Sequence, residues 1–142
     1  MHTINKHDRI ISMLTAAGIR LSHQRMAILQ YLLDHNTHPT VADIYDHLHP
    51  EFPTLSRTTV YNTLKLLVES GAVTQLDIDT ESAHYDADLS PHAHFLCRCC
   101  RRVFDVPLPS HLLEVPQGFT TDSVSISYHG LCPSCAKDTL LN

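Results

Sequence analysis

The stretch SRTTVYNTLKLLVESG at residues 56–71 decides how the first half of the chain folds. Ser56 offers a side-chain oxygen that can cap the first turn of a helix. Apolar residues then recur at helical spacing from Val60 onward, and Gly71 suits the left-handed position after a helix. Two prolines in the preceding segment, HPEFPTL at residues 49–55, are incompatible with a helix interior. We therefore predict a helix that follows a proline-containing turn and buries one apolar face.

Three further helices are expected before this one. Apolar residues of the segment 4–17 have helical spacing, and Gly18 can end that helix. Ser22 can cap a second helix, and Thr40 a short third helix that runs through Leu48. The sequence thus predicts a small helical core in the first half of the chain.

After Gly71 the apolar pattern changes from helical to alternating. Residues 73–78 alternate, a polar turn follows, and His84, Tyr85 and Asp86 resume the pattern, which predicts a β-hairpin. Helices followed by a hairpin are the layout of a winged helix-turn-helix, in which the helix after the proline turn enters the major groove of DNA. A helical module with no DNA role has the same layout and remains open at this point.

The second half of the chain is expected to form a separate, smaller unit. The polar segment that ends in Pro91 has the composition of a linker. Short apolar runs at residues 94–97, 102–106 and 123–128 predict strands, with one or two helical turns at 108–115. We expect an α+β fold with a winged-helix DNA-binding domain at 1–86, a linker at 87–91, and a small C-terminal α/β domain for dimerisation and metal binding at 92–142. A unit this small usually needs a metal, disulfides or a partner chain for stability.

Composition and charge narrow the class of protein. The net charge of −5 is carried by the second half, because residues 1–71 hold six basic and six acidic residues whereas residues 72–142 hold four and nine. The overall sign therefore does not exclude a nucleic-acid partner. Residues 1–14 lack the layout of a signal peptide, and the chain has no apolar run near the ~20 residues that a bilayer span requires. We expect a cytoplasmic protein with no membrane partner.

The cysteines form two C-x-x-C pairs. Cys97 and Cys100 are one pair, and Cys132 and Cys135 are the other. In a reducing compartment such pairs indicate metal or redox chemistry, and four thiolates suit the closed tetrahedral site of a structural Zn²⁺. Unpaired core cysteines or a redox dithiol are the alternatives. Cys99 lies between two expected ligands and is assigned no function, although a thiol in this place is open to oxidation.

A second set of metal-ligating residues surrounds the motif His92-Ala93-His94. Alternate residues of a strand share a face, so both imidazoles can bind one ion. His38, Asp86 and Asp105 are candidate partners that would complete a nitrogen and oxygen set fitting Fe²⁺, Mn²⁺ or Zn²⁺. Each of these residues considered alone is better explained as a surface or hydrogen-bonded side chain.

Several motifs in this order resemble the ferric uptake regulator (Fur) family over nearly the whole chain. They are RLSHQRMAIL, SRTTVYNTLKLL, HYD, HAHFLCRCC, RVFDV and GLCPSC. The resemblance implies a homodimer whose regulatory metal site contains His38, Asp86, His92, His94 and Asp105, and whose structural zinc is held by Cys97, Cys100, Cys132 and Cys135.

Aspartate at position 105, with Asp86 before the linker, resembles the peroxide-sensing PerR branch of the family. In that branch His38 and His92 would be the oxidation-sensitive ligands. Positions 91, 93 and 124, where iron-sensing members can supply a further metal site, are Pro91, Ala93 and Val124, so one sensory metal per chain is expected. The segment between Cys100 and Cys132 is shorter than is usual in the family, which leaves the dimer geometry open.

The resemblance implies a metal-dependent repressor that binds double-stranded DNA with a palindromic operator and responds to peroxide through Fe²⁺ or Mn²⁺. An iron-, zinc- or manganese-responsive regulator of the same family is the alternative. From other classes, a zinc-stabilised adaptor and a metalloenzyme remain, but the HAH motif has no nearby glutamate of the kind that zinc deaminases use, and we expect no enzyme. The residues expected to contact DNA are Arg20, Arg25, Arg57, Thr58, Thr59, Tyr61, Asn62 and Lys65.

Overall fold

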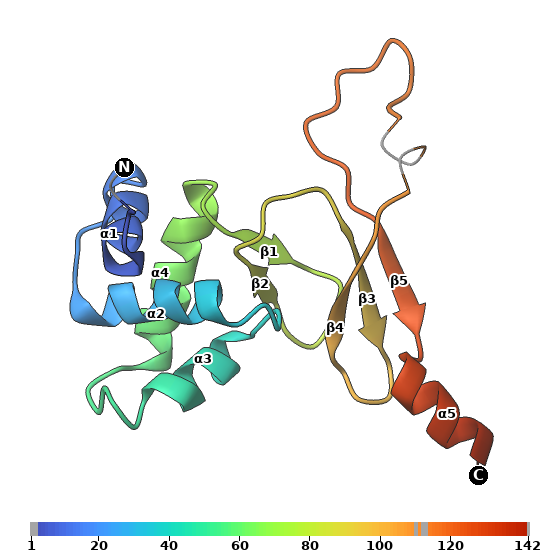
Figure 1. Cartoon of the computed structure of the whole chain (residues 1–142), viewed down its shortest axis with the longest axis horizontal. Helices are drawn as coiled ribbons and strands as arrows, with labels where there is room; N and C mark the ends of the chain where they lie inside the picture. Colours follow the sequence, from blue (N-terminus) through green and yellow to red (C-terminus); the bar gives the residue numbers. More distant parts are fainter. Residues whose placement is uncertain (1–2, 110, 112–113, 142) are drawn as a thin grey trace. The chain divides into compact units, whose positions relative to one another are not determined.

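The computed structural model describes residues 3–109, 111 and 114–141. The chain divides into two compact units, residues 1–89 (the N-terminal unit) and residues 90–142 (the C-terminal unit), and each is described by itself (Figure 1). The domain assignment made from the sequence, with its linker at 87–91, stays a prediction. No helix in the described part of the chain combines the length and apolar character that a membrane span requires.

Four helices form the core of the N-terminal unit, each begun by a polar side chain that caps a backbone N–H of the first turn. The caps are Asn5, Ser22, Thr40 and Ser56, and Thr40 forms a complete capping box with Asp43. The helices are α1 Lys6–Ala16, α2 His23–Asp34, α3 Val41–Leu48 and α4 Arg57–Glu69. Their apolar faces meet in one core that includes Ile10, Leu14, Ile28, Leu29, Ile44, Val60, Leu64 and Leu67.

The expected hairpin completes the N-terminal unit. Strand β1 (Thr74–Leu76) pairs antiparallel with β2 (His84–Asp86), and Leu76 faces His84 in the register. Gly71, between α4 and the hairpin, has a φ of 80°, as the sequence predicted for the residue that ends this helix. All three residues of β2 are buried, so the hairpin carries polar side chains into the interior of the unit.

The C-terminal unit is a three-stranded sheet followed by a helix. Its elements are β3 Ala93–Cys97, β4 Val103–Val106, β5 Ser127–Gly130 and α5 Pro133–Leu141. The strand order is β4-β3-β5; β3 pairs antiparallel with β4 and parallel with β5 (Figure 1). The α+β class expected from the sequence is therefore confirmed.

Two details of the C-terminal unit differ from the sequence prediction. The last strand, expected at 123–128, spans Ser127–Gly130, because its limits are set by parallel pairing with β3 rather than by the local apolar pattern. Helix α5, which begins with a proline at its first position, was not predicted. The helical turns expected at 108–115 fall in part on residues 110, 112 and 113, which lie outside the described residues.

Candidate metal centres and nucleic-acid interface

The four cysteines of the two C-x-x-C pairs converge in the C-terminal unit. The Sγ atoms of four cysteines all lie within 4.8 Å of one another: Cys97, Cys100, Cys132 and Cys135. The parallel pairing of β3 and β5 places Cys97 opposite Gly130, so the second pair follows directly beside the first. Sulfurs at this spacing fit the edges of a tetrahedron with metal–sulfur bonds of about 2.3 Å, as Zn²⁺ requires.

The backbone of the C-terminal unit favours the thiolate form of one of these ligands. The N–H of Cys132 donates to Sγ of the buried Cys97 over 3.4 Å. This hydrogen bond is the main cause that lowers the pKa of Cys97 to about 6. The neighbouring Cys132 thiol, and then burial, raise the pKa of Cys135. Four thiolates so close together repel one another, so the cluster loses all its protons only when a cation offsets the negative charge. A divalent metal ion supplies that charge.

The C-terminal unit also assembles His92, His94 and Asp105. His94 of β3 lies directly opposite Asp105 of β4 in the antiparallel register, and His92 is two residues earlier, on the same face. Oδ1 of Asp105 is 3.0 Å from Nε2 of His92 and 3.5 Å from Nε2 of His94. Nδ1 of His92 donates to the carbonyl oxygen of Ser90 (2.6 Å), a hydrogen bond of the kind that orients a metal-binding imidazole and sets its tautomer.

The remaining two expected ligands, His38 and Asp86, meet inside the N-terminal unit. Nε2 of His38 is 3.3 Å from Oδ2 of Asp86, and both side chains are 2% exposed. The other carboxylate oxygen of Asp86 accepts the N–H of Asp88 (2.8 Å), so the carboxylate is held in one orientation. Each unit therefore contains its own preassembled group of nitrogen and oxygen ligands, of the kind that Fe²⁺, Mn²⁺ and Zn²⁺ accept.

Asp79 and His84, which lie next to this pair, were not among the residues predicted for the site. Nδ1 of His84 is 2.6 Å from the carbonyl oxygen of His38, and its Nε2 is 3.1 Å from Oδ2 of Asp79. His84 is 6% exposed and Asp79 is 9% exposed. A polar residue at a buried position of an alternating strand is the pattern that could have pointed to His84.

Helix α4 presents most of the expected DNA contacts on one face. Val60, Thr63, Leu64 and Leu67 are buried, whereas Arg57, Thr58, Tyr61, Asn62 and Lys65 are exposed, together with Leu66 and Glu69. These exposed residues recur at intervals of four, so they line one side of the helix. The Tyr61 side chain is 51% exposed, which leaves its ring available for an apolar contact.

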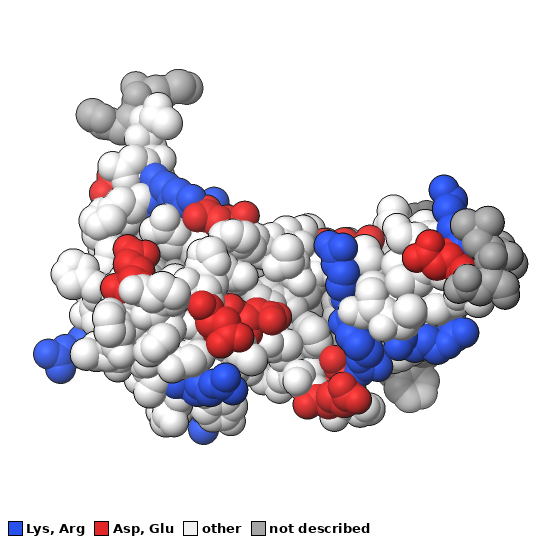
Figure 2. Space-filling model, turned by 90° about the horizontal axis from the view of Figure 1, so that it is seen from below, with Lys and Arg blue, Asp and Glu red and all other residues white. Residues whose placement is uncertain are grey.

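Two of the expected DNA-contacting arginines also bind within the N-terminal unit. The Arg57 guanidinium lies over the Tyr45 ring, 5.1 Å from its centroid. Arg25 donates to the carbonyl oxygen of Arg20 (2.8 Å) and so ties the start of α2 to the preceding turn. On the face drawn in Figure 2, basic and acidic side chains are interspersed among uncharged residues, in keeping with the low net charge.

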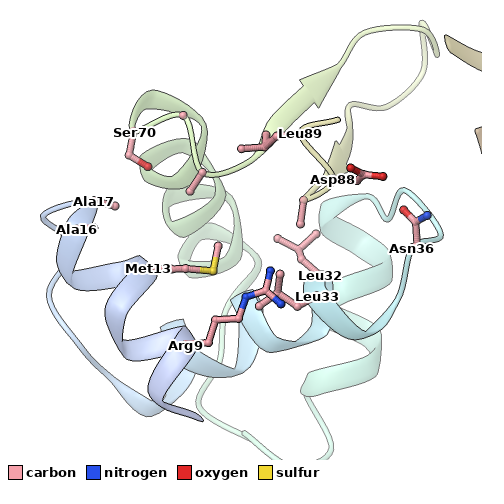
Figure 3. Close-up of a pocket in the computed structure, with 13 residues that line it drawn as sticks. Arg9, Met13, Ala16, Ala17, Leu32, Leu33, Asn36, Ser70, Asp88 and Leu89 are labelled. Atoms are coloured by element: carbon pink, nitrogen blue, oxygen red, sulfur yellow. The ribbon is translucent and has the colours of Figure 1, made fainter. Parts of the chain in front are cut away.

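A pocket of about 710 Å³ in the N-terminal unit lies apart from these ligands. Figure 3 shows its lining, which comes from α1, α2, the end of α4 and the segment after β2 and includes Arg9, Met13, Leu33 and Leu89. The described residues that line it include no His and no Cys. Its lining is mixed, with apolar side chains beside Arg9, Asp88, Asn36 and Ser70.

Comparison with known proteins identifies relatives of this sequence and fold. A family model described as "Ferric uptake regulator family" matches residues 16–131. The peroxide operon regulator of Bacillus subtilis (strain 168) is 38% identical over 130 residues, which are 87% of this chain and 89% of that protein.

Two solved structures extend the comparison. The peroxide-sensing regulator PerR from Streptococcus pyogenes has a TM-score of 0.54 at 28% identity, covering 92% of this chain and 93% of that chain. The ferric uptake regulator of Helicobacter pylori has a TM-score of 0.76 at 18% identity, with 96% and 97% of the two chains covered. The second likeness is one of fold alone.

Proposed function

Because the chain belongs to the ferric uptake regulator family, we propose that it is a metal-dependent transcriptional repressor that binds DNA and responds to peroxide. The repressor acts as a homodimer on a palindromic operator in the cytoplasm, and it has no catalytic role. The residues of α4 that contact DNA are Arg57, Thr58, Thr59, Tyr61, Asn62 and Lys65, and Arg20 and Arg25 supply further contacts.

The observation that carries this proposal is the presence of a preassembled ligand group in each unit. His38 and Asp86 are paired in the N-terminal unit, and His92, His94 and Asp105 in the C-terminal unit. We propose that one Fe²⁺ or Mn²⁺ is bound by both groups together, with Zn²⁺ as a possible substitute, while the four cysteines hold a structural Zn²⁺. The match of residues 16–131 to the family supports this assignment.

Binding both groups to one ion would fix the angle between the two units. The DNA-binding form is selected to the extent that it binds the ion more tightly than the other forms. Reversing a 99:1 preference between two forms requires about 5.5 kcal/mol of differential binding. Several charge-assisted ligand contacts from two units can supply a difference of this size.

The peroxide response follows from the identity of the ligands. Bound Fe²⁺ would activate peroxide for reaction with a ligand imidazole: one peroxide oxygen would be added to the ring, which is oxidised by two electrons, and the other oxygen would leave as water. His38 and His92 are the ligands that we expect to be oxidised, which would weaken metal binding and release the operator. The aspartate at position 105 and the 38% identity to a peroxide operon regulator support the peroxide response over a response to metal supply.

The test is operator binding measured by gel shift with Mn²⁺, Fe²⁺, Zn²⁺ or a chelator, before and after peroxide. We expect binding with Mn²⁺ or Fe²⁺, loss of binding with the chelator, and loss after peroxide only for the Fe²⁺ form. Mass spectrometry of that form should show an added oxygen on His38 or His92.

Other outcomes separate the alternatives. Metal-dependent binding that survives peroxide, with unmodified histidines, would indicate a regulator of metal homeostasis. Operator binding that is indifferent to all metals would leave a zinc-stabilised DNA binder, and no DNA binding at all would indicate an adaptor or an enzyme.

A further inference from the structure

The backbone at His38 has a conformation that its own sequence does not favour. Its φ is 54°, in the left-handed region that non-glycine residues rarely adopt. The following residue is Pro39, which further biases the residue before it toward extended backbone. A residue held in such a conformation depends on tertiary contacts to stay there. The orientation of the His38 side chain must therefore be set by its surroundings.

Strand β2 supplies those contacts. Nδ1 of His84 donates to the carbonyl oxygen of His38 (2.6 Å), and the N–H of Tyr85 donates to the carbonyl oxygen of Pro39 (3.0 Å). The two successive residues of β2 thus bind two successive carbonyls of the loop that carries His38. His38, His84 and Tyr85 are all buried, so water does not compete for these hydrogen bonds.

Asp79 fixes the ring that makes the first of these bonds. Nε2 of His84 is 3.1 Å from Oδ2 of Asp79, while Oδ1 of the same carboxylate accepts the N–H of Glu81 (3.0 Å). A carbonyl oxygen can only accept, so Nδ1 of His84 is the donor to His38, and Nε2 on the opposite side of the ring faces the Asp79 carboxylate. A hydrogen-bonded chain therefore runs from the hairpin turn through Asp79 and His84 to the His38 backbone.

We propose that Asp79 and His84 form a positioning pair, which holds His38 in its left-handed conformation and so presets the imidazole for the regulatory metal. The inference rests on the proposed function, in which His38 is a regulatory ligand. His84 does not itself bind the ion. It acts through its hydrogen bond to the His38 carbonyl. Residues that do not touch a metal commonly orient its ligands through such hydrogen bonds. Preorganisation of this kind raises the affinity for the metal, because the His38 side chain loses less conformational freedom when the ion binds.

Two substitutions separate positioning from plain structural support. His84→Asn keeps an amide donor near the place of Nδ1, facing the His38 carbonyl, but no longer reaches Asp79. His84→Gln keeps a donor near the place of Nε2, facing Asp79, but leaves the His38 carbonyl without its donor. Each variant retains one of the two buried hydrogen bonds, so a purely structural role predicts similar losses of stability and equal effects on metal binding.

The measurement is Mn²⁺ affinity of the full chain with its cysteine-bound zinc, by competition with a fluorescent chelator. We expect His84→Gln to weaken Mn²⁺ binding by about tenfold, and His84→Asn to stay close to the wild-type value. The ¹³Cα and ¹³Cβ chemical shifts of His38 in the protein without Mn²⁺ should move away from left-handed values in His84→Gln and remain in His84→Asn. His7→Gln, at an exposed position of α1, is the matched control and should change neither quantity.

Equal effects of the two His84 variants, or a larger effect of His84→Asn, would overturn the positioning role. The His38→Ala variant separates this failure from failure of the proposed function. If His38→Ala binds Mn²⁺ as well as the wild type, the ligand assignment itself is wrong. If His38→Ala weakens binding and His84→Gln does not, the ligand assignment holds and the positioning role is wrong. If His84 acts through His38, adding His84→Gln to His38→Ala should cause no further loss.

Discussion

At the residue scale, Cys97 is the side chain on which the C-terminal unit most depends. It ends the central strand β3, is fully buried, and accepts a hydrogen bond from the backbone of Cys132. That bond lowers the Cys97 pKa to about 6, so the thiolate is accessible near neutral pH. Cys99, two residues later, is exposed.

We expect Cys97→Ser to abolish zinc binding and unfold the C-terminal unit, because structural zinc contributes on the order of 10 kcal/mol to folding in small zinc domains. Elemental mass spectrometry measures the zinc content, and near-ultraviolet circular dichroism measures the loss of folded structure. Cys99→Ser is the matched control and should keep the zinc. Loss of zinc in Cys99→Ser alone would show that Cys99 rather than a C-x-x-C partner is the ligand.

A second residue-scale prediction concerns the ion pair between Lys6 and Asp34, which joins α1 to α2. The hydrogen bond from Lys6 lowers the pKa of Asp34, so the pair stabilises the fold above the ordinary aspartate pKa of about 3.9 and this contribution is lost as pH falls through the lowered value. Because both side chains are partly exposed, we expect Asp34→Asn to cost under about 1 kcal/mol at pH 7.

Urea unfolding of the wild type and Asp34→Asn at several pH values measures this contribution. The difference between the two should shrink as the pH is lowered below 4 and stay constant between pH 6 and 8. A difference that grows toward acid would contradict the assignment of the ion pair as the cause.

At the scale of the element, helix α4 divides its residues between the core and an exposed face. Ser56 caps its first turn, Gly71 follows its last, and the buried residues of one face hold it against the other helices. The opposite face carries Lys65 and Tyr61, both exposed. We expect the two residues to contribute differently to DNA binding. A lysine neutralises phosphate and adds affinity for any DNA, whereas a tyrosine ring packs against base edges and adds specificity.

We expect Lys65→Ala to weaken binding to the operator and to unrelated DNA alike, and to lower the slope of log affinity against log salt by about 1. Tyr61→Ala should instead reduce the preference for the operator by about 1–3 kcal/mol. Fluorescence anisotropy over a salt series measures both. Lys137→Ala, an exposed position of α5, is the control and should bind like the wild type.

At the scale of the whole molecule, stability is divided between two units of different kinds. The N-terminal unit has a continuous apolar core built from four helices and the hairpin. In its described residues, the C-terminal unit has a short sheet, helix α5 and a cysteine cluster, and few side chains outside β3 are buried there. A unit with so little core depends on its metal for folding.

Removal of zinc by a strong chelator should therefore unfold the C-terminal unit and leave the N-terminal unit folded. Amide hydrogen exchange is the measurement: protection of β3–β5 should be lost, while protection of α2 and α4 persists. Simultaneous loss of protection in both units would show that the N-terminal unit depends on its neighbour.

Local sequence determined the elements of the N-terminal unit and the chemistry of the site. Three kinds of signal act within one or two turns of chain: capping residues such as Thr40 and Ser56, the left-handed Gly71, and the spacing of apolar residues. They can therefore be recognised in the sequence without the tertiary structure. The C-x-x-C and H-x-H motifs are equally local, since their ligands are a few residues apart. The ligand roles of His38, Asp86, His92, His94 and Asp105 stay predictions until the metal is measured.

Tertiary structure alone decided how distant residues meet. Pairing of β5 with β3 set the limits of that strand and brought the second cysteine pair beside the first, although about thirty residues separate them in sequence. Likewise, the hydrogen bond from His84 to His38 joins positions 46 residues apart and supports the left-handed backbone of His38. Such contacts depend on which strand edges and buried polar groups find one another in space, and nothing in the local pattern of either segment encodes the partner.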